Sequence, residues 1–205
     1  MPTQSVNSWR SALQVKRFRT KLIITVTLLA IYASLAPFLF NFIQHREGYF
    51  LNDYLLNRLP TYDVSGAIFF TLYLLVIFGI YSLIRDPNLF LTALQAYLLL
   101  TVFRSATMLL LPLEPPPGIA ELHDPLVQSL FYQQSVTKDL FFSGHTSLVM
   151  LLGLFMTKLQ WRIVFFIGTG LVAALLLIQH AHYTIDILIA PLFSWLAYRI
   201  TPKKS

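Results

Sequence analysis

Two histidines and an aspartate carry the most distinctive chemistry in this sequence. His182 and Asp186 are four residues apart, and His145 lies in a separate segment, Phe142-Ser-Gly-His-Thr146. Residues i and i+4 share one face of a helix. We therefore expect the Asp186 carboxylate to hold the His182 imidazole in one tautomer and to stabilise its cation, as the carboxylate does in a hydrolase triad.

A cation, Arg104, and two small residues, Ser143 and Gly144, complete the group of candidate site residues. Arg104 stands alone in an otherwise charge-free stretch, and arginine clamps phosphate oxygens through paired hydrogen bonds. Ser143 and Gly144 precede His145, and glycine lets an anion come close to the backbone. Two histidines and a cation favour phosphoryl transfer, in which one histidine attacks phosphorus and the other protonates the leaving oxygen.

Plainer interpretations compete with this one. His145 alone suits a hydrogen bond between helices, and Arg104 alone suits a structural snorkelling cation. His180, His182 and Asp186 have side chains that suit zinc or iron, but His180 and His182 are two residues apart and so lie on different helix faces. Ser143 is a weaker nucleophile candidate, because adjacent spacing does not point it toward His145.

The composition restricts the class of protein. Of the 205 residues 56% are hydrophobic and only 12% are charged, against about 25% charged residues in a typical soluble domain. A soluble globule of this size cannot hide so much apolar side chain, and a disordered chain would be far more polar. The chain has no cysteine, which excludes disulfides, thiolate metal sites and cysteine nucleophiles. An integral membrane protein remains.

Charge-poor runs of roughly 20 residues, the length that crosses a bilayer, predict six membrane spans in an all-α bundle. They lie near 22–43, 66–84, 88–113, 141–158, 162–181 and 183–199. Pro37 and Pro191 fall inside spans, which membrane helices tolerate. The first run follows a basic leader, but it is longer than the 7–15 residues, roughly, of a signal-peptide core. We therefore expect it to remain as an uncleaved helix.

Lysine and arginine near span ends set the orientation, because they favour the cytoplasmic side. With both termini in the cytoplasm, the inner side carries Arg10, Lys16, Arg17, Arg19, Lys21, Arg85, Lys158, Arg162, Arg199, Lys203 and Lys204. The outer side carries only Arg46, Arg58 and Lys138. The basic charge is therefore a topology signal rather than a sign of nucleic-acid binding. This orientation also places His145, His182 and Asp186 in one outer layer, with Arg104 nearby.

The expected domain plan is simple. A basic cytoplasmic tail (1–20) leads into one six-span membrane domain (21–200), and a short cytoplasmic tail (201–205) follows. The two substantial loops, near 44–65 and 114–140, both fall on the outer side, and the apolar residues of the first suit the headgroup plane. We therefore expect the substrate to be handled at the outer, periplasmic, exoplasmic or lumenal face.

At these residues the chain resembles the sphingomyelin synthase-like branch of the lipid phosphate phosphatase (PAP2) superfamily. Asp139-Leu-Phe-Phe-Ser-Gly-His-Thr146 resembles that branch's Asp-x3-Ser-Gly-His-Thr motif, and His182-Tyr-Thr-Ile-Asp186 resembles its His-Tyr-Thr-x-Asp motif. Arg104-Ser-Ala-Thr-Met108 is similar to a third, looser motif, and the stretch from Leu59-Pro60 to Asp63 to a weaker fourth. The resemblance runs from about residue 20 to 200 and includes the six-span plan.

The resemblance implies a role for each position. His182 would be the nucleophile that takes a phospho-head-group as phosphohistidine, and Asp186 would orient it. His145 would protonate the departing diacylglycerol and then deprotonate an acceptor lipid alcohol such as ceramide. Asp139 corresponds to a position linked to head-group choice. The remaining predicted phosphate- or substrate-binding residues are Arg104, Lys138, Ser143, Gly144 and Tyr183, and no metal or other cofactor is implied.

Departures from the general phosphatase pattern favour a transferase over a phosphatase. That pattern has Ser-Arg before the second histidine, where this chain has Leu175-Leu176, and proline before Ser-Gly-His, where it has Phe142. The synthases carry Cys-Gly before the aspartate, where Thr137-Lys138 stand here.

We therefore expect an integral membrane phosphotransferase that moves a phospho-head-group from a glycerophospholipid to a lipid alcohol. A lipid phosphate phosphatase and a non-enzymatic scaffold or transporter are the alternatives. Four aromatic residues before His145, namely Phe131, Tyr132, Phe141 and Phe142, are predicted to form an apolar entrance for the alcohol.

Overall fold

In the computed structural model of the chain, residues 8–120, 122 and 136–202 are described. These residues form seven α-helices and one 3₁₀ helix, and they contain no β-strand beyond the isolated bridge between Tyr49 and Leu113. The helices are α1 (Trp9–Gln14), α2 (Lys16–His45), α3 (Ser65–Leu83), α4 (Pro87–Leu110), α6 (Gly144–Phe155), α7 (Leu159–Ile178) and α8 (Thr184–Ile200), and the 3₁₀ helix is η1 (Leu56–Arg58). The expected all-α class is confirmed.

Four helices are long and apolar enough to cross a membrane by length and composition: α2, α3, α4 and α7. Helix α6 has 12 residues, so it rises about 18 Å at 1.5 Å per residue, less than the roughly 30 Å hydrocarbon core. Helix α8 has 17 residues. Several apolar helices indicate a multi-pass membrane protein, and the count of six spans stays a prediction.

The fourth predicted span, 141–158, is helical only from Gly144. The stretch before it, residues 136–143, has no regular helix or strand. Irregular backbone at membrane depth is tolerated where protein buries it, and here Leu140, Phe142 and Ser143 are all buried. This helix is therefore shorter than its apolar sequence run.

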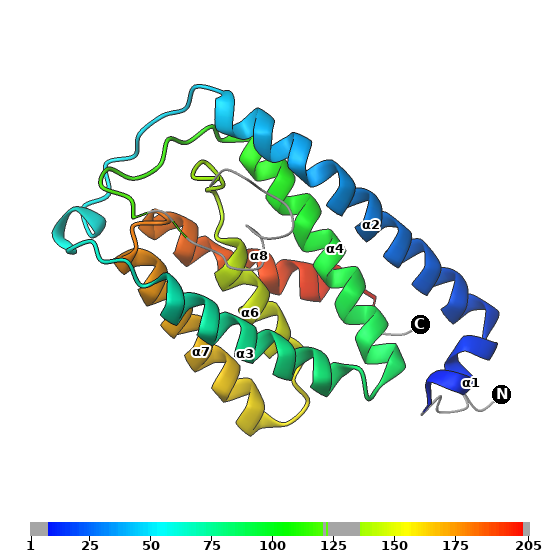
Figure 1. The fold of residues 1–205 in the computed structure, drawn as a ribbon. Helices are drawn as coiled ribbons and strands as arrows, with labels where there is room; N and C mark the ends of the chain where they lie inside the picture. The colour runs from blue at the N-terminus through cyan, green and yellow to red at the C-terminus, as the bar shows by residue number, and fades with distance from the viewer. Residues whose placement is uncertain (1–7, 121, 123–135, 203–205) are drawn as a thin grey trace.

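Helix α6 occupies the centre of the bundle, with α3, α4, α7 and α8 packed around it (Figure 1). The principal core draws most of its buried side chains from these five helices, among them Ile68, Ala96, Val149, Val172 and Ala190. Helix α2 lies along α4 at the edge of the bundle (Figure 1). Large apolar side chains such as Phe38 and Phe42 are exposed on α2, as expected of a surface that faces lipid.

The connection between α2 and α3 and the one after α4 pack together at one end of the bundle (Figure 1). Tyr49 N–H donates to Pro112 O at 2.9 Å, and Glu114 N–H donates to Tyr49 O at 3.0 Å. A Cβ on Gly48 would lie 2.7 Å from the Leu113 carbonyl carbon, so glycine permits this close approach. Tyr183, which directly precedes α8, contacts both loops through Glu114 O and Leu51 N–H, and the side of the membrane on which this end lies stays a prediction.

Part of the predicted amino-terminal tail is helical. Helix α1 and the first turn of α2 fall within residues 1–20. Trp9 Nε1 donates a hydrogen bond to Ile84 O at 2.7 Å, and Ala12, Phe18 and Leu91 form a small separate core. The tail therefore packs against the end of the bundle where α3 and α4 meet.

Candidate active site

Helix α8 begins at Thr184, so Asp186 lies in its first turn and His182 precedes it. The expectation that the two residues share a helix face was wrong, but the pair is in contact. Asp186 is fully buried and His182 is 4% exposed, and His182 Nδ1 lies 3.4 Å from Asp186 Oδ2. The same carboxylate oxygen accepts from Tyr183 N–H at 3.1 Å, which satisfies one of the free amides at the start of the helix. Asp186 therefore fixes the helix start and the imidazole together.

The way in which α7 ends explains why His182 stands at this turn. His180 N–H donates to Leu177 O at 3.0 Å, and Ala181 N–H donates to Leu176 O at 3.1 Å. With His180 at a φ of 54°, these two bonds form a Schellman ending, in which one residue adopts the left-handed conformation. The chain reverses within Gln179–His182, and α8 starts directly afterwards.

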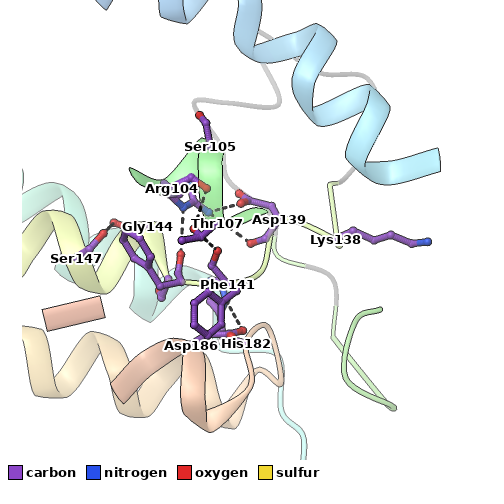
Figure 2. Close-up of polar contacts among 12 residues, drawn as sticks. Arg104, Ser105, Thr107, Lys138, Asp139, Phe141, Gly144, Ser147, His182 and Asp186 are labelled. Carbon is purple, nitrogen blue, oxygen red and sulfur yellow. Dashed lines mark hydrogen bonds and ion pairs between the residues drawn. The ribbon is translucent and has the colours of Figure 1, made fainter. Parts of the chain in front are cut away.

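Arg104 ties α4 to the start of α6. Its Nε donates to Phe142 O at 3.1 Å, and its Nη2 forms an ion pair with Asp139. A Cβ on Gly144 would lie only 2.6 Å from Arg104 Nη1, so the glycine lets the guanidinium rest against the backbone. Figure 2 shows Arg104, Asp139 and Gly144 gathered at this point.

The two histidine segments are joined directly. Ser143 N–H donates to Asp186 O at 3.2 Å, and Ser194 Oγ on α8 donates to Ser147 O on α6 at 2.8 Å. Arg104, the Ser143–His145 segment and His182–Asp186 therefore come from three helices to one region of the bundle. His145 is half-buried, and its ring packs edge-on against Phe69 with centroids 5.8 Å apart.

Other predicted site residues have structural contacts. Ser143 Oγ caps α6 by accepting from Thr146 N–H. Lys138 Nζ donates to Glu114 Oε1 at 2.7 Å and to Arg46 O at 2.8 Å, and its side chain points away from Arg104 (Figure 2). The structure therefore does not bring the Lys138 ammonium to the Arg104–Gly144 region.

Tyr183 also faces the loops. Its hydroxyl donates to Glu114 O at 3.0 Å and accepts from Leu51 N–H at 3.3 Å, and its side chain is 1% exposed. This buried contact holds the loops over the start of α8.

Only two of the four aromatic residues that were predicted to form an entrance lie within the described residues. Phe131 and Tyr132 lie outside the described residues. Phe142 is fully buried and stacks on Phe193 with ring centroids 4.3 Å apart, so it packs the core instead of lining an entrance. Phe141 is half-buried, and its carbonyl accepts from Thr107 Oγ1 at 2.9 Å.

His180, the third residue of the metal-binding alternative, has contacts of its own. The His180 ring nitrogens face two loop carbonyls, with Nε2 3.2 Å from Leu59 O and Nδ1 3.4 Å from Pro117 O. Across residues 8–120, 122 and 136–202, no group of three histidine, cysteine, aspartate or glutamate side chains is arranged to hold a metal ion.

Sequence reasoning missed Asp53, which reaches α8 from the loop after α2. Its carboxylate accepts from Thr184 N–H at 2.6 Å and from Thr184 Oγ1 at 2.9 Å. Partial burial raises the pKa of Asp53, but hydrogen bonds from Leu56, Thr184 and Leu55 outweigh it and leave the pKa below its ordinary value. The residue therefore carries a stabilised negative charge beside the first turn of α8.

Gln179 is the second residue that sequence reasoning missed. It is fully buried; its Nε2 donates to Ser65 Oγ at 3.0 Å and to Ala120 O at 3.2 Å, and its Oε1 accepts from Val64 N–H at 2.6 Å. A single amide thus joins the end of α7, the start of α3 and the loop after α4. The only feature of the sequence that pointed to Gln179 was its amide side chain within an apolar run.

The carboxyl-terminal third of the chain provides the link to known proteins. Residues 138–203 match the family model of the PAP2 superfamily C-terminal domain. The matched segment includes both histidines, Asp139 and Asp186, and it supports membership of the PAP2 superfamily. It does not distinguish the sphingomyelin synthase-like branch. No curated protein matches the chain.

Members of that superfamily are generally phosphatases or phosphotransferases, so the match supports an enzyme that acts on lipid phosphates. Arg104 lies outside the matched segment. Its place beside the histidine segments rests on its own contacts with Phe142 and Asp139.

Proposed function

We propose that the chain is a membrane phosphotransferase that moves a phospho-head-group from a glycerophospholipid to a lipid alcohol through phosphohistidine at His182. The observation that carries the proposal is the buried His182–Asp186 contact joined to the Ser143–His145 segment through the Ser143–Asp186 hydrogen bond. Because Nδ1 faces the carboxylate, Nε2 is the ring nitrogen that would attack. The 3.4 Å contact is long, and such contacts often tighten only when substrate binds.

The reaction balances in two displacements. In the first, His182 Nε2 forms a bond to phosphorus, the bond from phosphorus to the diacylglycerol oxygen breaks, and His145 gives that oxygen a proton. In the second, His145 removes the proton of the acceptor alcohol, whose oxygen bonds to phosphorus while the bond to Nε2 breaks. His145 thus ends as it began, as expected of a group that serves first as acid and then as base.

Arg104 would stabilise the phosphate oxygens during both steps. An arginine has five N–H donors, and in this structure Nε and Nη2 contact Phe142 O and Asp139. Nη1 lies over Gly144, where it could turn to a phosphate beside His145. Asp139, through its ion pair with Arg104, would then influence which head group fits.

The runner-up, a lipid phosphate phosphatase, differs only in the acceptor, because water would replace the alcohol. Transfer is favoured by Leu175 and Leu176, which stand where the phosphatase pattern has Ser-Arg. Leu176 is fully buried and Leu175 packs on the same core, so neither position offers a cation to hold a free phosphate.

The test uses purified full-length protein and a phospholipid labelled in its head group, with ceramide, diacylglycerol or no alcohol added. We expect the label to move to the lipid alcohol in excess over the water-soluble product. Production of the hydrolysed product alone with every alcohol would assign the chain to the phosphatases. Turnover unchanged in His182→Ala would favour a protein without this catalytic site.

A further inference from the structure

A cavity with both polar and apolar lining lies at the opposite end of the bundle from His182. Its volume is about 240 Å³, and residues from the start of α4, the end of α6, the start of α7 and the end of α8 line it. It begins at Asp86, 18 residues before Arg104 on the same helix, which is about 27 Å along a helix axis. The cavity is therefore separate from the candidate active site and does not depend on the proposed function.

One cation lines this cavity. Arg162 Nη2 donates to Met156 O at 2.8 Å, which holds the guanidinium in place. Arg162 Nε is buried and has no hydrogen-bond partner among the described residues. An unsatisfied buried donor is costly, and a phosphate oxygen is a strong acceptor for a guanidinium.

One carboxylate also lines the cavity. Asp86 Oδ1 caps α4 by accepting from Asn88 N–H at 3.0 Å and from Leu89 N–H at 3.1 Å. Arg162 and Asp86 form no ion pair with each other in the described part of the chain. The wall thus presents separate positive and negative groups, an arrangement that suits a ligand with both a phosphate and an ammonium.

The remaining lining and the surroundings point to a lipid. Leu89, Leu154, Phe155 and Met156 give the cavity an apolar side. Its volume is below the range of about 300–1,000 Å³ for drug-sized ligand pockets, which suits a head group rather than a whole lipid. Basic pockets between helices at the membrane surface are known to bind lipid head groups.

We propose that this cavity binds the head group of a phospholipid carrying a primary ammonium, with the phosphate on Arg162 and the ammonium beside Asp86. Asp86 disfavours a purely anionic head group at the same place, because the like charges would repel. The apolar side takes the first carbons of the lipid, whose acyl chains remain in the bilayer. The bound lipid is structural and is not consumed.

The test measures which lipids remain on the purified full-length chain after exchange into bilayer discs with equal phosphatidylethanolamine and phosphatidylglycerol, read by native mass spectrometry. We expect retained phosphatidylethanolamine to fall about tenfold in Arg162→Gln, as for loss of one charge-assisted hydrogen bond. The matched control is Arg199→Gln, an exposed arginine at the same end that does not line the cavity, and it should retain the lipid. Equal retention in the two variants would overturn the proposal.

Asp86→Asn provides an independent variant, since asparagine caps helices as well as aspartate does and Arg162 stays unchanged. We expect it to shift retention from phosphatidylethanolamine toward phosphatidylglycerol, and an unchanged ratio would contradict the ammonium assignment. Soluble glycerophosphoethanolamine should not displace the lipid. Displacement at equal concentration would mean a site for a soluble phosphate ester instead.

Discussion

At the scale of single residues, Asp186 makes two contacts with one carboxylate oxygen, to the His182 ring and to the Tyr183 amide. Replacing it by asparagine keeps the shape but removes the charge that would stabilise the His182 cation. The consequence should be chemical rather than structural, because the side-chain oxygen of an asparagine can still accept from the Tyr183 amide.

We predict that His145→Ala lowers turnover by roughly 10²–10⁴-fold, the range for loss of one acid–base group. His182→Ala and Asp186→Asn should abolish most turnover, because they remove the nucleophile and the carboxylate that orients it, and none of the three changes should prevent membrane insertion. Because the three groups serve one reaction, their losses should not add. Turnover of the single variants and of the His145/His182 double variant is the measurement. If the fold-loss in turnover of the double variant equalled the product of the two single fold-losses, the histidines would act independently.

A substitution at Gly144 tests the role of Arg104 in the reaction without changing the arginine itself. Its Cβ would lie 2.6 Å from Arg104 Nη1, and a flexible side chain can move aside at small cost, so Gly144→Ala should fold. The guanidinium would be displaced, however, and a shift of about 1 Å can cost about 10²-fold in rate.

Gly66→Ala is the matched control for this change. Gly66 also lies in the first turn of a helix, α3, and apart from its chain neighbours and the backbone of its own helix no described atom lies within 4 Å of a Cβ there. Its turnover should match the wild type. Similar turnover in both glycine variants would remove Arg104 from the reaction.

At the scale of the elements, the start of α8 is held from a distant loop. Asp53 contacts Thr184 across 131 residues of sequence, and Gln179 contacts Ser65 across 114. The spacing of His182 and Asp186 is local and was visible in the sequence. Contacts at such separations leave no periodic signal, so the loop residues that position α8 could not be predicted.

We predict that Asp53→Asn lowers stability at neutral pH by about 1–3 kcal/mol, the scale of a hydrogen bond lost from a charged group, because the amide keeps only one of the two oxygens that accept from Thr184. The Asp53 pKa lies below its ordinary value of 3.8 in the folded chain, so the carboxylate stabilises the fold above that value. Its contribution disappears as the pH falls through the folded pKa. Thermal unfolding in detergent between pH 7 and pH 3 should therefore show wild type and variant converging at the acid end.

Glu47→Gln is the control, since Glu47 is an exposed carboxylate in the same loop. It should track the wild type at every pH. A constant gap between wild type and Asp53→Asn down to pH 3 would mean that the carboxylate charge contributes nothing.

Helix boundaries followed from the sequence to within a few residues for α3, α7 and α8, because apolar runs end where charges begin. The apolar run at 141–158 predicted a helix longer than α6, because hydropathy cannot distinguish a buried irregular stretch from a helix. The contacts of Arg104 with Phe142 O and Asp139 satisfy this stretch, and they depend on tertiary packing. The same packing buries Phe142, which the sequence placed at an entrance.

At the scale of the whole molecule, the orientation in the membrane is predicted from lysine and arginine counts and can be measured directly. The chain has no cysteine, so single cysteines introduced at exposed positions are unique labels. Asn57 lies in the loop after α2 and Gln160 in the first turn of α7, and both are exposed.

We predict that Asn57→Cys reacts with a membrane-impermeant maleimide applied to intact cells or sealed vesicles of native orientation. Gln160→Cys should react only after the membrane is opened. Labelling in the reverse order would place the candidate active site on the cytoplasmic side.

Whether His182 carries the phosphorus between donor and acceptor can be measured directly. The full-length chain is mixed with a phospholipid labelled at its head-group phosphorus, quenched before the acceptor is added, and mapped by peptide analysis. We expect an acid-labile label on His182 that is absent from His182→Ala and is lost when a lipid alcohol is supplied. A label on Ser143, or one that persists in His182→Ala, would contradict it.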